Sequence, residues 1–108
     1  MTDEPTVTRN AELSRYEIRT GDVLAGFAEY KERDEEILFT HTEVDPAFQG
    51  MGLAPVLAGE ALADAVATGK TLVPYCPYIA RYLKRNQIEG AEIRWPQLPE
   101  DPAGNDKK

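Results

Sequence analysis

The chain contains one histidine, His41, and one cysteine, Cys76, and both side-chain types can do chemistry. Imidazole exchanges a proton near neutral pH, so His41 is a candidate general base. Cys76 precedes Pro77, where we expect a helix to begin, and a helix N-terminus stabilises the thiolate that acts as a nucleophile. The alternative is structural for both: a histidine packed beside a partner, and a cysteine buried as a small apolar side chain.

The same two residues limit the metal and redox chemistry that is open to the chain. A single cysteine excludes an intrachain disulfide and a zinc site with several thiolates. The remaining ligand types are carboxylates and one imidazole, and they show no metal-ligand spacing. We therefore predict no metal site.

The glycine-rich segment Gln49-Gly50-Met51-Gly52-Leu53-Ala54 is a second candidate for chemistry. It follows a predicted strand and opens a predicted helix, where unpaired backbone N–H groups and the helix dipole favour an anion. No Gly-Lys-Ser/Thr follows, so the segment is not a Walker loop, and the spacing does not fit a dinucleotide fingerprint. Two glycines before a helix are also compatible with a plain structural turn.

Three predicted strands precede this turn. Residues 16–19, 23–30 and 37–44 have extended patterns, and the short turns between them indicate an antiparallel meander. Strict alternation in the third strand would place Ile37, Phe39, His41 and Glu43 on one face.

A helix is predicted after the turn, from Ala54 to about Thr68, with Gly69 as its C-terminal cap. Its buried stripe is spaced by four residues and comprises Leu53, Leu57, Ala61 and Ala65. Residues 70–74 then read as a strand parallel to its neighbour, and 79–86 as a second helix. The fold class expected from these elements is α+β with a mixed, mainly antiparallel sheet.

The two ends of the chain carry weaker patterns than its middle. Residues 1–12 are polar and aperiodic and are interpreted as a flexible arm, residues 13–96 as one domain, and residues 97–108 as a disordered polar tail. We find no signal peptide and no apolar run that could span a bilayer, so we expect a cytoplasmic protein.

The formal net charge is −7, which disfavours binding to nucleic acid or to an anionic membrane. An acidic surface suits a cationic substrate such as an amine, but it is equally well explained by solubility.

The segments on either side of the glycine-rich turn make its function more specific. Gln49 to Ala54 satisfies the Q/R-x-x-G-x-G/A pattern of the GNAT superfamily of N-acetyltransferases, and it follows the third predicted strand as in that family. The stretch from His41 to Gly52 resembles the signature of the minimal, single-domain GNAT-like subfamily. The stretch from Val73 to Ile79 resembles that subfamily's second signature. The resemblance extends over roughly residues 16–86, although Asn86-Gln87-Ile88-Glu89 departs from the subfamily's usual ending.

The resemblance implies a minimal GNAT-like fold that binds acetyl-CoA or coenzyme A and transfers an acetyl group to an amine. His41 would be the base, and Cys76 would carry the acetyl group or protonate the departing thiolate, with Tyr78 and Tyr82 as rival acids. Arg81, Lys84 and Arg85 would attract the cofactor's phosphates or simply form a solvated helix face. The implied cofactor-binding residues are Thr42, Glu43, Val44, Gln49, Gly50, Met51, Gly52, Leu53, Ala54, Tyr82 and Arg85.

The sequence also allows a second function. A non-catalytic CoA-binding module, acting as a sensor or as a partner-binding protein, is the alternative function, because so short a chain leaves little protein for an amine pocket.

Overall fold

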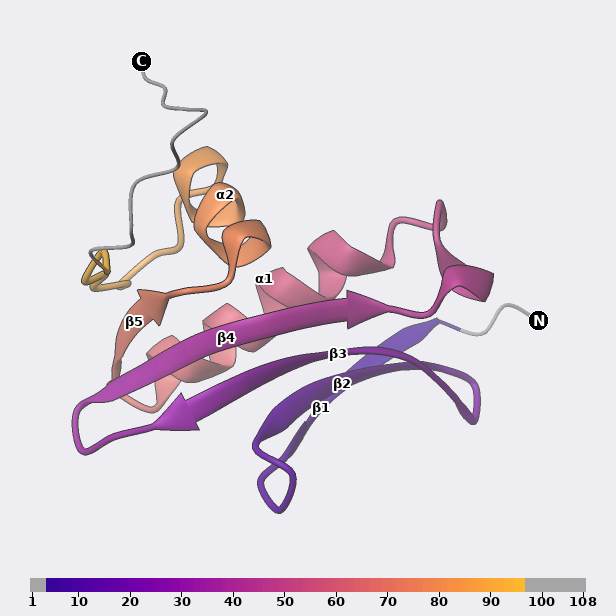
Figure 1. Ribbon diagram of the computed structural model, residues 1–108, viewed down its shortest axis with the longest axis horizontal. Helices are drawn as coiled ribbons and strands as arrows, with labels where there is room; N and C mark the ends of the chain where they lie inside the picture. The colour runs from indigo at the N-terminus through magenta and orange to yellow at the C-terminus, as the bar shows by residue number, and fades with distance from the viewer. Residues whose placement is uncertain (1–3, 97–108) are drawn as a thin grey trace.

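The computed structural model describes residues 4–96 of the 108-residue chain. One five-stranded sheet has the order β1-β2-β3-β4-β5, in which β1 to β4 are antiparallel neighbours and β5 is parallel to β4 (Figure 1). The elements in chain order are β1 (Pro5–Asn10), β2 (Arg15–Thr20), β3 (Val23–Glu32), β4 (Glu36–Val44), η1 (Pro46–Phe48), α1 (Leu53–Ala67), β5 (Thr71–Pro74) and α2 (Pro77–Arg85). The predicted α+β class, with a meander and one parallel strand, is confirmed.

Strand β1 corrects the interpretation of the N-terminal residues. We expected a flexible arm over 1–12, but Pro5–Asn10 pairs along its whole length with β2. Backbone hydrogen bonds to β2 hold this strand, and Val7 packs against the core. One apolar side chain in six residues leaves too little alternation for a pattern to be recognised. The predicted tail, 97–108, lies outside the described residues.

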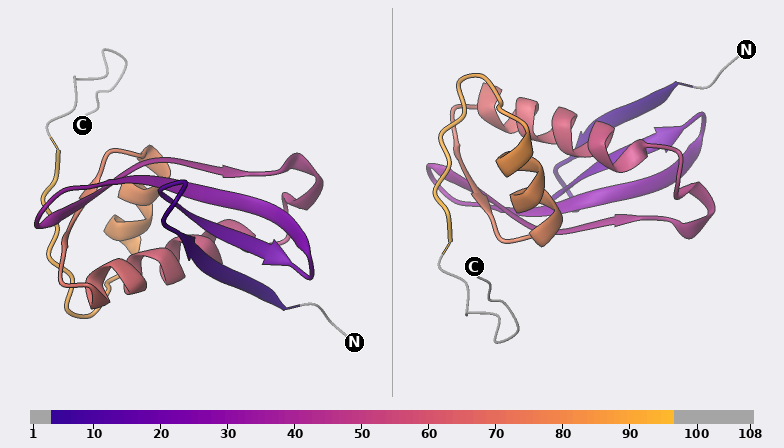
Figure 2. Two further views of the ribbon diagram at one scale, coloured as in Figure 1. Left: turned by 90° about the horizontal axis from the view of Figure 1, so that it is seen from below. Right: turned by 90° about the horizontal axis from the view of Figure 1, so that it is seen from above.

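Both helices pack on one face of the sheet (Figure 2), and a single core lies between the two layers. The predicted stripe of α1 is confirmed, since Leu53, Leu57, Ala61 and Ala65 are buried. Small alanines let the helix lie close to the strands. The hydroxyl of buried Tyr16 on β2 donates to the exposed Asp64 of α1 at 2.7 Å, which fixes the helix against the meander.

The opposite face of the sheet carries charged side chains in place of a helix in the described part of the chain. Glu17 is nearly buried there, with Arg15 Nε and Arg19 Nη2 each 2.9 Å from its carboxylate oxygens. Burial alone would raise the pKa of Glu17, but the hydrogen bonds from Arg15, Asn10 and Arg19 outweigh it and lower that pKa. The Arg15 guanidinium also lies 4.7 Å from the ring centroid of Phe27. This paired, polar surface can therefore face water.

An irregularity in β4 makes one prediction from the alternation wrong. Glu29 pairs with His41, but the next residue, Tyr30, pairs with Phe39, so Thr40 is an extra residue in β4. The Thr40 hydroxyl donates to the Glu29 carbonyl at 3.3 Å. Paired residues share a face and consecutive residues alternate, so the bulge turns His41 to the face opposite Phe39. Phe39 is buried under the helices, whereas His41 lies on the open face.

Strands β4 and β5 pair over only four residues and then separate. The pairing ends at Phe39 and Pro74, and the Phe39 carbonyl accepts the amides of both Tyr75 and Cys76, at 2.9 and 2.8 Å. Beyond this point β4 continues to Val44, while the chain after β5 turns into α2 (Figure 1). The last part of β4 is thus left without a β5 partner on that side.

The segment after α2 docks on the outer edge of β5. Ile93 forms a parallel bridge with Leu72, and the Leu72 carbonyl accepts the Arg94 amide at 2.9 Å. Arg94 Nη2 donates to Glu36 Oε1 on β4 at 3.0 Å. These contacts hold the segment after α2 against the sheet without a regular strand or helix in it.

The approach of β3 to β4 requires a glycine at position 26, which generates our first prediction. A Cβ at Gly26 would lie 2.6 Å from the Glu43 carbonyl oxygen and 3.1 Å from Val44 Cα, both of them backbone atoms that cannot move aside cheaply. We expect Gly26→Ala to lower the free energy of unfolding by roughly 1–3 kcal/mol, as in overpacked cores. Urea denaturation measures this change. Thr8→Ala on the exposed side of β1 is the control, expected to stay within about 0.5 kcal/mol, and equal effects of the two substitutions would contradict the predicted clash.

Candidate functional site

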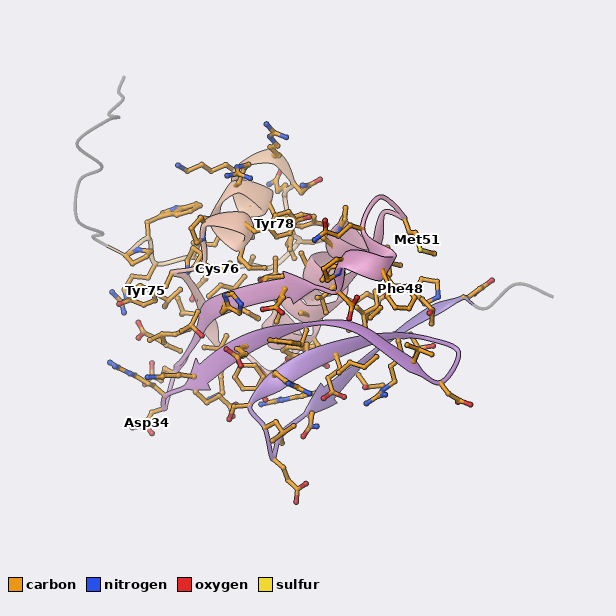
Figure 3. The ribbon with its side chains drawn as sticks, turned by 45° about the vertical axis from the view of Figure 1, so that its right-hand side comes forward. Asp34, Phe48, Met51, Tyr75, Cys76 and Tyr78 are labelled. Carbon is orange, nitrogen blue, oxygen red and sulfur yellow. The ribbon has the colours of Figure 1, made fainter. Side chains whose placement is uncertain are left out.

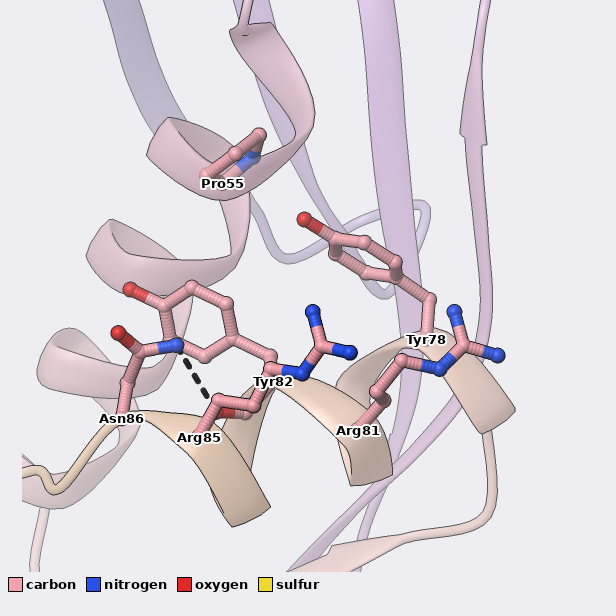
Figure 4. A pocket seen from close by; sticks show the side chains of 6 residues that line it. All are labelled: Pro55, Tyr78, Arg81, Tyr82, Arg85 and Asn86. Carbon is pink, nitrogen blue, oxygen red and sulfur yellow. Dashed lines mark hydrogen bonds between the residues drawn. The ribbon is translucent and has the colours of Figure 1, made fainter.

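A groove begins where the end of β4 meets the start of α1. Its cavity has a volume of about 380 Å³, and a second cavity of about 260 Å³ adjoins it beside α2. Pro55 and Tyr78 line both cavities, so the two cavities form one groove. Figure 4 shows the part beside α2. The residues that line the groove are Val44, Phe48, Gln49, Gly50, Gly52, Leu53, Ala54, Pro55, Tyr78, Arg81, Tyr82, Arg85 and Asn86.

The turn between β4 and α1 is held by its own side chains. Asp45 Oδ1 accepts the Ala47 amide at 2.9 Å and so caps η1, and Gln49 Nε2 donates to the Val44 carbonyl at 3.3 Å. Gly50 and Gly52 have φ values of +86° and +75°, a region that favours glycine. Gln49 and the two glycines thus fix the path of the chain into α1.

The N-terminus of α1 lacks a side-chain cap. Its N-cap residue is Gly52, and no acidic residue lies in the first turn. The first backbone N–H groups of a helix have no intrahelical partner, and together with the helix dipole they attract anions. Gly52, Leu53 and Ala54 line the groove, so this end of the helix lies at the cavity. This end of the groove is suited to a phosphate.

Helix α2 supplies the basic wall of the groove. Arg81 and Arg85 are exposed and lie along the cavity with Tyr82 and Asn86 (Figure 4). Tyr82 reaches across to α1, where a Cβ at Gly59 would lie only 2.8 Å from its hydroxyl oxygen. Two positive charges beside the N-terminus of α1 can attract an anion to this wall, in a chain that is acidic overall.

Tyr78 joins the two halves of the groove. Burial is the largest cause that raises the pKa of its hydroxyl, and the neighbouring Tyr82 raises it further. Tyr78 is therefore neutral near pH 7 and can donate a proton or a hydrogen bond into the groove.

His41 lies outside the groove, on the open face of the sheet. Its Nε2 is 3.1 Å from Glu43 Oε1, and its ring centroid is 6.2 Å from that of Phe27. The His41 and Glu43 side chains are 54% and 59% exposed, so this pair is accessible to water. Glu43 also lines a small cavity of about 110 Å³ on that side, together with Phe27 and Asp45.

Cys76 lies on the helix face, at the residue that precedes α2 (Figure 3). Its side chain is in the core, with only 4% of the residue exposed, and its Sγ is 3.4 Å from Thr42 Oγ1. His41 and Cys76 therefore have different partners on different faces of the sheet. The structure places both near the end of β4 but does not join them in one hydrogen-bonded pair.

The predicted binding residues divide into two groups. The groove contains eight of them: Val44, Gln49, Gly50, Gly52, Leu53, Ala54, Tyr82 and Arg85. Three of them do not line it: Thr42 contacts Cys76, Glu43 contacts His41, and the side chain of Met51 is largely exposed (Figure 3).

Sequence reasoning missed three residues of the groove, namely Phe48, Pro55 and Asn86. Asn86 had a usable signal, since it lies four residues after Tyr82 and so on the same side of the helix end. Its amide donates to the Tyr82 carbonyl at 3.1 Å. Pro55 indicates only that a helix can begin there, and Phe48 has no pattern that distinguishes it.

Two broader features of the described residues bear on the kind of site. Within residues 4–96, no helix combines the length and apolarity needed to cross a membrane. Over the same residues, no three His, Cys, Asp or Glu side chains gather in a way that could hold a metal ion.

One family model matches most of the chain. A search of curated proteins found no match to the chain. The family model described as GCN5-related N-acetyl-transferase matches residues 15–93, which include all of β2 to α2 and the whole groove. The chain therefore belongs to the GCN5-related N-acetyltransferase family.

Proposed function

We propose that the chain is an acetyl-CoA-dependent N-acetyltransferase that transfers an acetyl group to an amine. The observation that carries this proposal is the uncapped N-terminus of α1, which opens into a groove with a basic far wall. Membership of an acetyltransferase family supports the same conclusion. Bound acetyl-CoA would supply the activated thioester, and the chain would bind it, orient it and manage the protons.

The groove fits a cofactor with several phosphates. Backbone amides from Gly50 to Ala54 would hold the pyrophosphate, and Arg81 and Arg85 would attract the remaining phosphate charge. The stretch of β4 beyond Phe39 has no β5 partner, so its backbone is available to the amides of an extended pantetheine arm. Such an arm would lead towards Thr42 and Cys76.

The two faces of the sheet suggest how the chemistry is divided. On the helix face, the Cys76 thiolate would attack the acetyl carbon, and the thiol of the cofactor would leave and take up a proton. On the open face, His41 beside Glu43 would deprotonate an incoming amine, and the neutral amine would then attack the acetyl-cysteine and release the Cys76 thiolate. In the direct alternative the amine attacks the thioester itself, and Cys76 or Tyr78 protonates the departing thiolate.

Cofactor binding is tested first, by calorimetry with CoA. We expect Arg85→Gln to weaken CoA binding several-fold, because a charge-assisted contact worth on the order of 1 kcal/mol is lost at an exposed position. Arg33→Gln removes the same charge from the turn after β3, away from the groove, and serves as the control. Equal weakening by both substitutions would indicate a general charge effect, and no CoA binding by the wild type at millimolar concentration would refute the proposal.

The fit of Tyr82 over Gly59 gives a further prediction. Gly59→Ala gains helix propensity of about 1 kcal/mol, so the protein should remain at least as stable once the tyrosine has moved. The displaced Tyr82 ring should then narrow the groove and raise the Kd for CoA several-fold. Tyr82→Phe lacks the hydroxyl that the new methyl group meets, so Gly59→Ala should have little further effect in that background. Independent, additive effects in the double variant would contradict this contact.

Catalysis is tested by CoA release from acetyl-CoA with a panel of amines. We expect Cys76→Ala to lower kcat at least 100-fold while the Kd for CoA stays within about twofold, since the thiol acts on the acetyl group. Cys76→Ser is the matched variant that keeps the size of the side chain. Undiminished turnover would remove Cys76 from the mechanism, and CoA binding without turnover for any amine would favour the non-catalytic module.

A further inference from the structure

The side chains of Thr42 and Cys76 are in contact, and neither residue lines the groove. Sγ and Oγ1 are 3.4 Å apart, within reach of a sulfur hydrogen bond. Thr42 does not line the groove, so the groove does not account for the position of its hydroxyl. Among the described residues, Thr42 is the one whose side chain hydrogen-bonds to the Cys76 sulfur.

The fold fixes both partners of this contact. Thr42 pairs with Ala28 in the β3–β4 ladder, two residues past the bulge at Thr40, and its branched side chain has few rotamers. Cys76 is held by its amide on the Phe39 carbonyl and by its position as the N-cap residue of the nine-residue helix α2. The pair is thus set by two backbone anchors on neighbouring elements.

We infer that Thr42 is a positioning residue that holds the Cys76 sulfur and stabilises its thiolate, an inference that rests on the proposed acetyl transfer. A hydroxyl can both accept and donate, so it accepts from the thiol and donates to the thiolate after the proton leaves. A hydrogen bond to an ionised group is about twice as strong as a neutral one. The contact therefore favours the nucleophilic form of the sulfur.

The other titratable groups near Cys76 do not duplicate this role. Tyr78 on α2 stays neutral near pH 7, because burial raises its pKa. His41 adjoins Thr42 on β4, but its ring is bound to Glu43 on the open face. The members of the core cluster from α1 and β5 are apolar, and those from β2 and β3 include the tyrosines Tyr16 and Tyr30.

Because the chain has a single cysteine, alkylation by iodoacetamide reports on this thiol alone, with Cys76→Ala as the blank. The measured quantity is the pH at which the alkylation rate is half-maximal. We expect Thr42→Val, which replaces the hydroxyl by a methyl group, to raise this midpoint by about one pH unit and to slow labelling about tenfold below it. Thr42→Ser keeps a hydroxyl and should return the midpoint to that of the wild type. Equal midpoints for the wild type and Thr42→Val would overturn the inference.

Steady-state kinetics separate this role from a cofactor contact. We expect Thr42→Val to lower kcat and to leave the KM for acetyl-CoA unchanged, with the loss largest at low pH. A raised KM with an unchanged kcat would assign Thr42 to cofactor binding and overturn the inference. If the wild type shows no turnover, the proposed function fails, while the alkylation profile still decides whether Thr42 stabilises the thiolate. Thr42→Ala is the second variant for the same measurements if Thr42→Val does not fold.

Discussion

The site depends on one carbonyl group, that of Phe39, which accepts the amides of both Tyr75 and Cys76. This shared acceptor ends the pairing of β4 with β5 and fixes where α2 begins. Upstream of it the two strands form a continuous parallel pair, and downstream β4 runs on alone. The groove, the placement of the cysteine and the access to the backbone of β4 all follow from that divergence.

Much of the fold could be predicted because its signals are local. The spacing by four in α1, the glycines after β4 and the short turns of the meander each determine an element on their own. The bulge at Thr40 has no such signal, because one extra residue leaves the apolar pattern of Ile37 to Phe39 intact. Its effect appears only when β3 and β4 are paired, and it moved His41 to the opposite face. Strand β1 was missed for a similar reason. Its own residues show no strand pattern, and its extended structure depends on pairing with β2.

The candidate site was predictable to the extent that one continuous segment builds it. The turn from Gln49 to Ala54 carries its own pattern, and the structure places most of it in the groove. The opposite wall comes from α2, and which of its residues face the groove depends on how that helix packs against α1. The positions of Asn86 and Phe48 in the groove therefore depend on how the whole chain folds. Thr42, which the resemblance places at the cofactor, contacts the cysteine, and this contact shows only in the folded chain.

The docking of the segment after α2 also governs how the sheet ends. The segment that contains Ile93 and Arg94 lies along the outer edge of β5. Its backbone hydrogen-bonds to the amide and the carbonyl of Leu72, so part of this edge is already paired. On the other side, β1 presents an open edge that begins with a proline. Unpaired edges are where sheets join one another during aggregation or strand exchange. In the described part of the molecule, β1 is thus the edge of the sheet that a further strand would join.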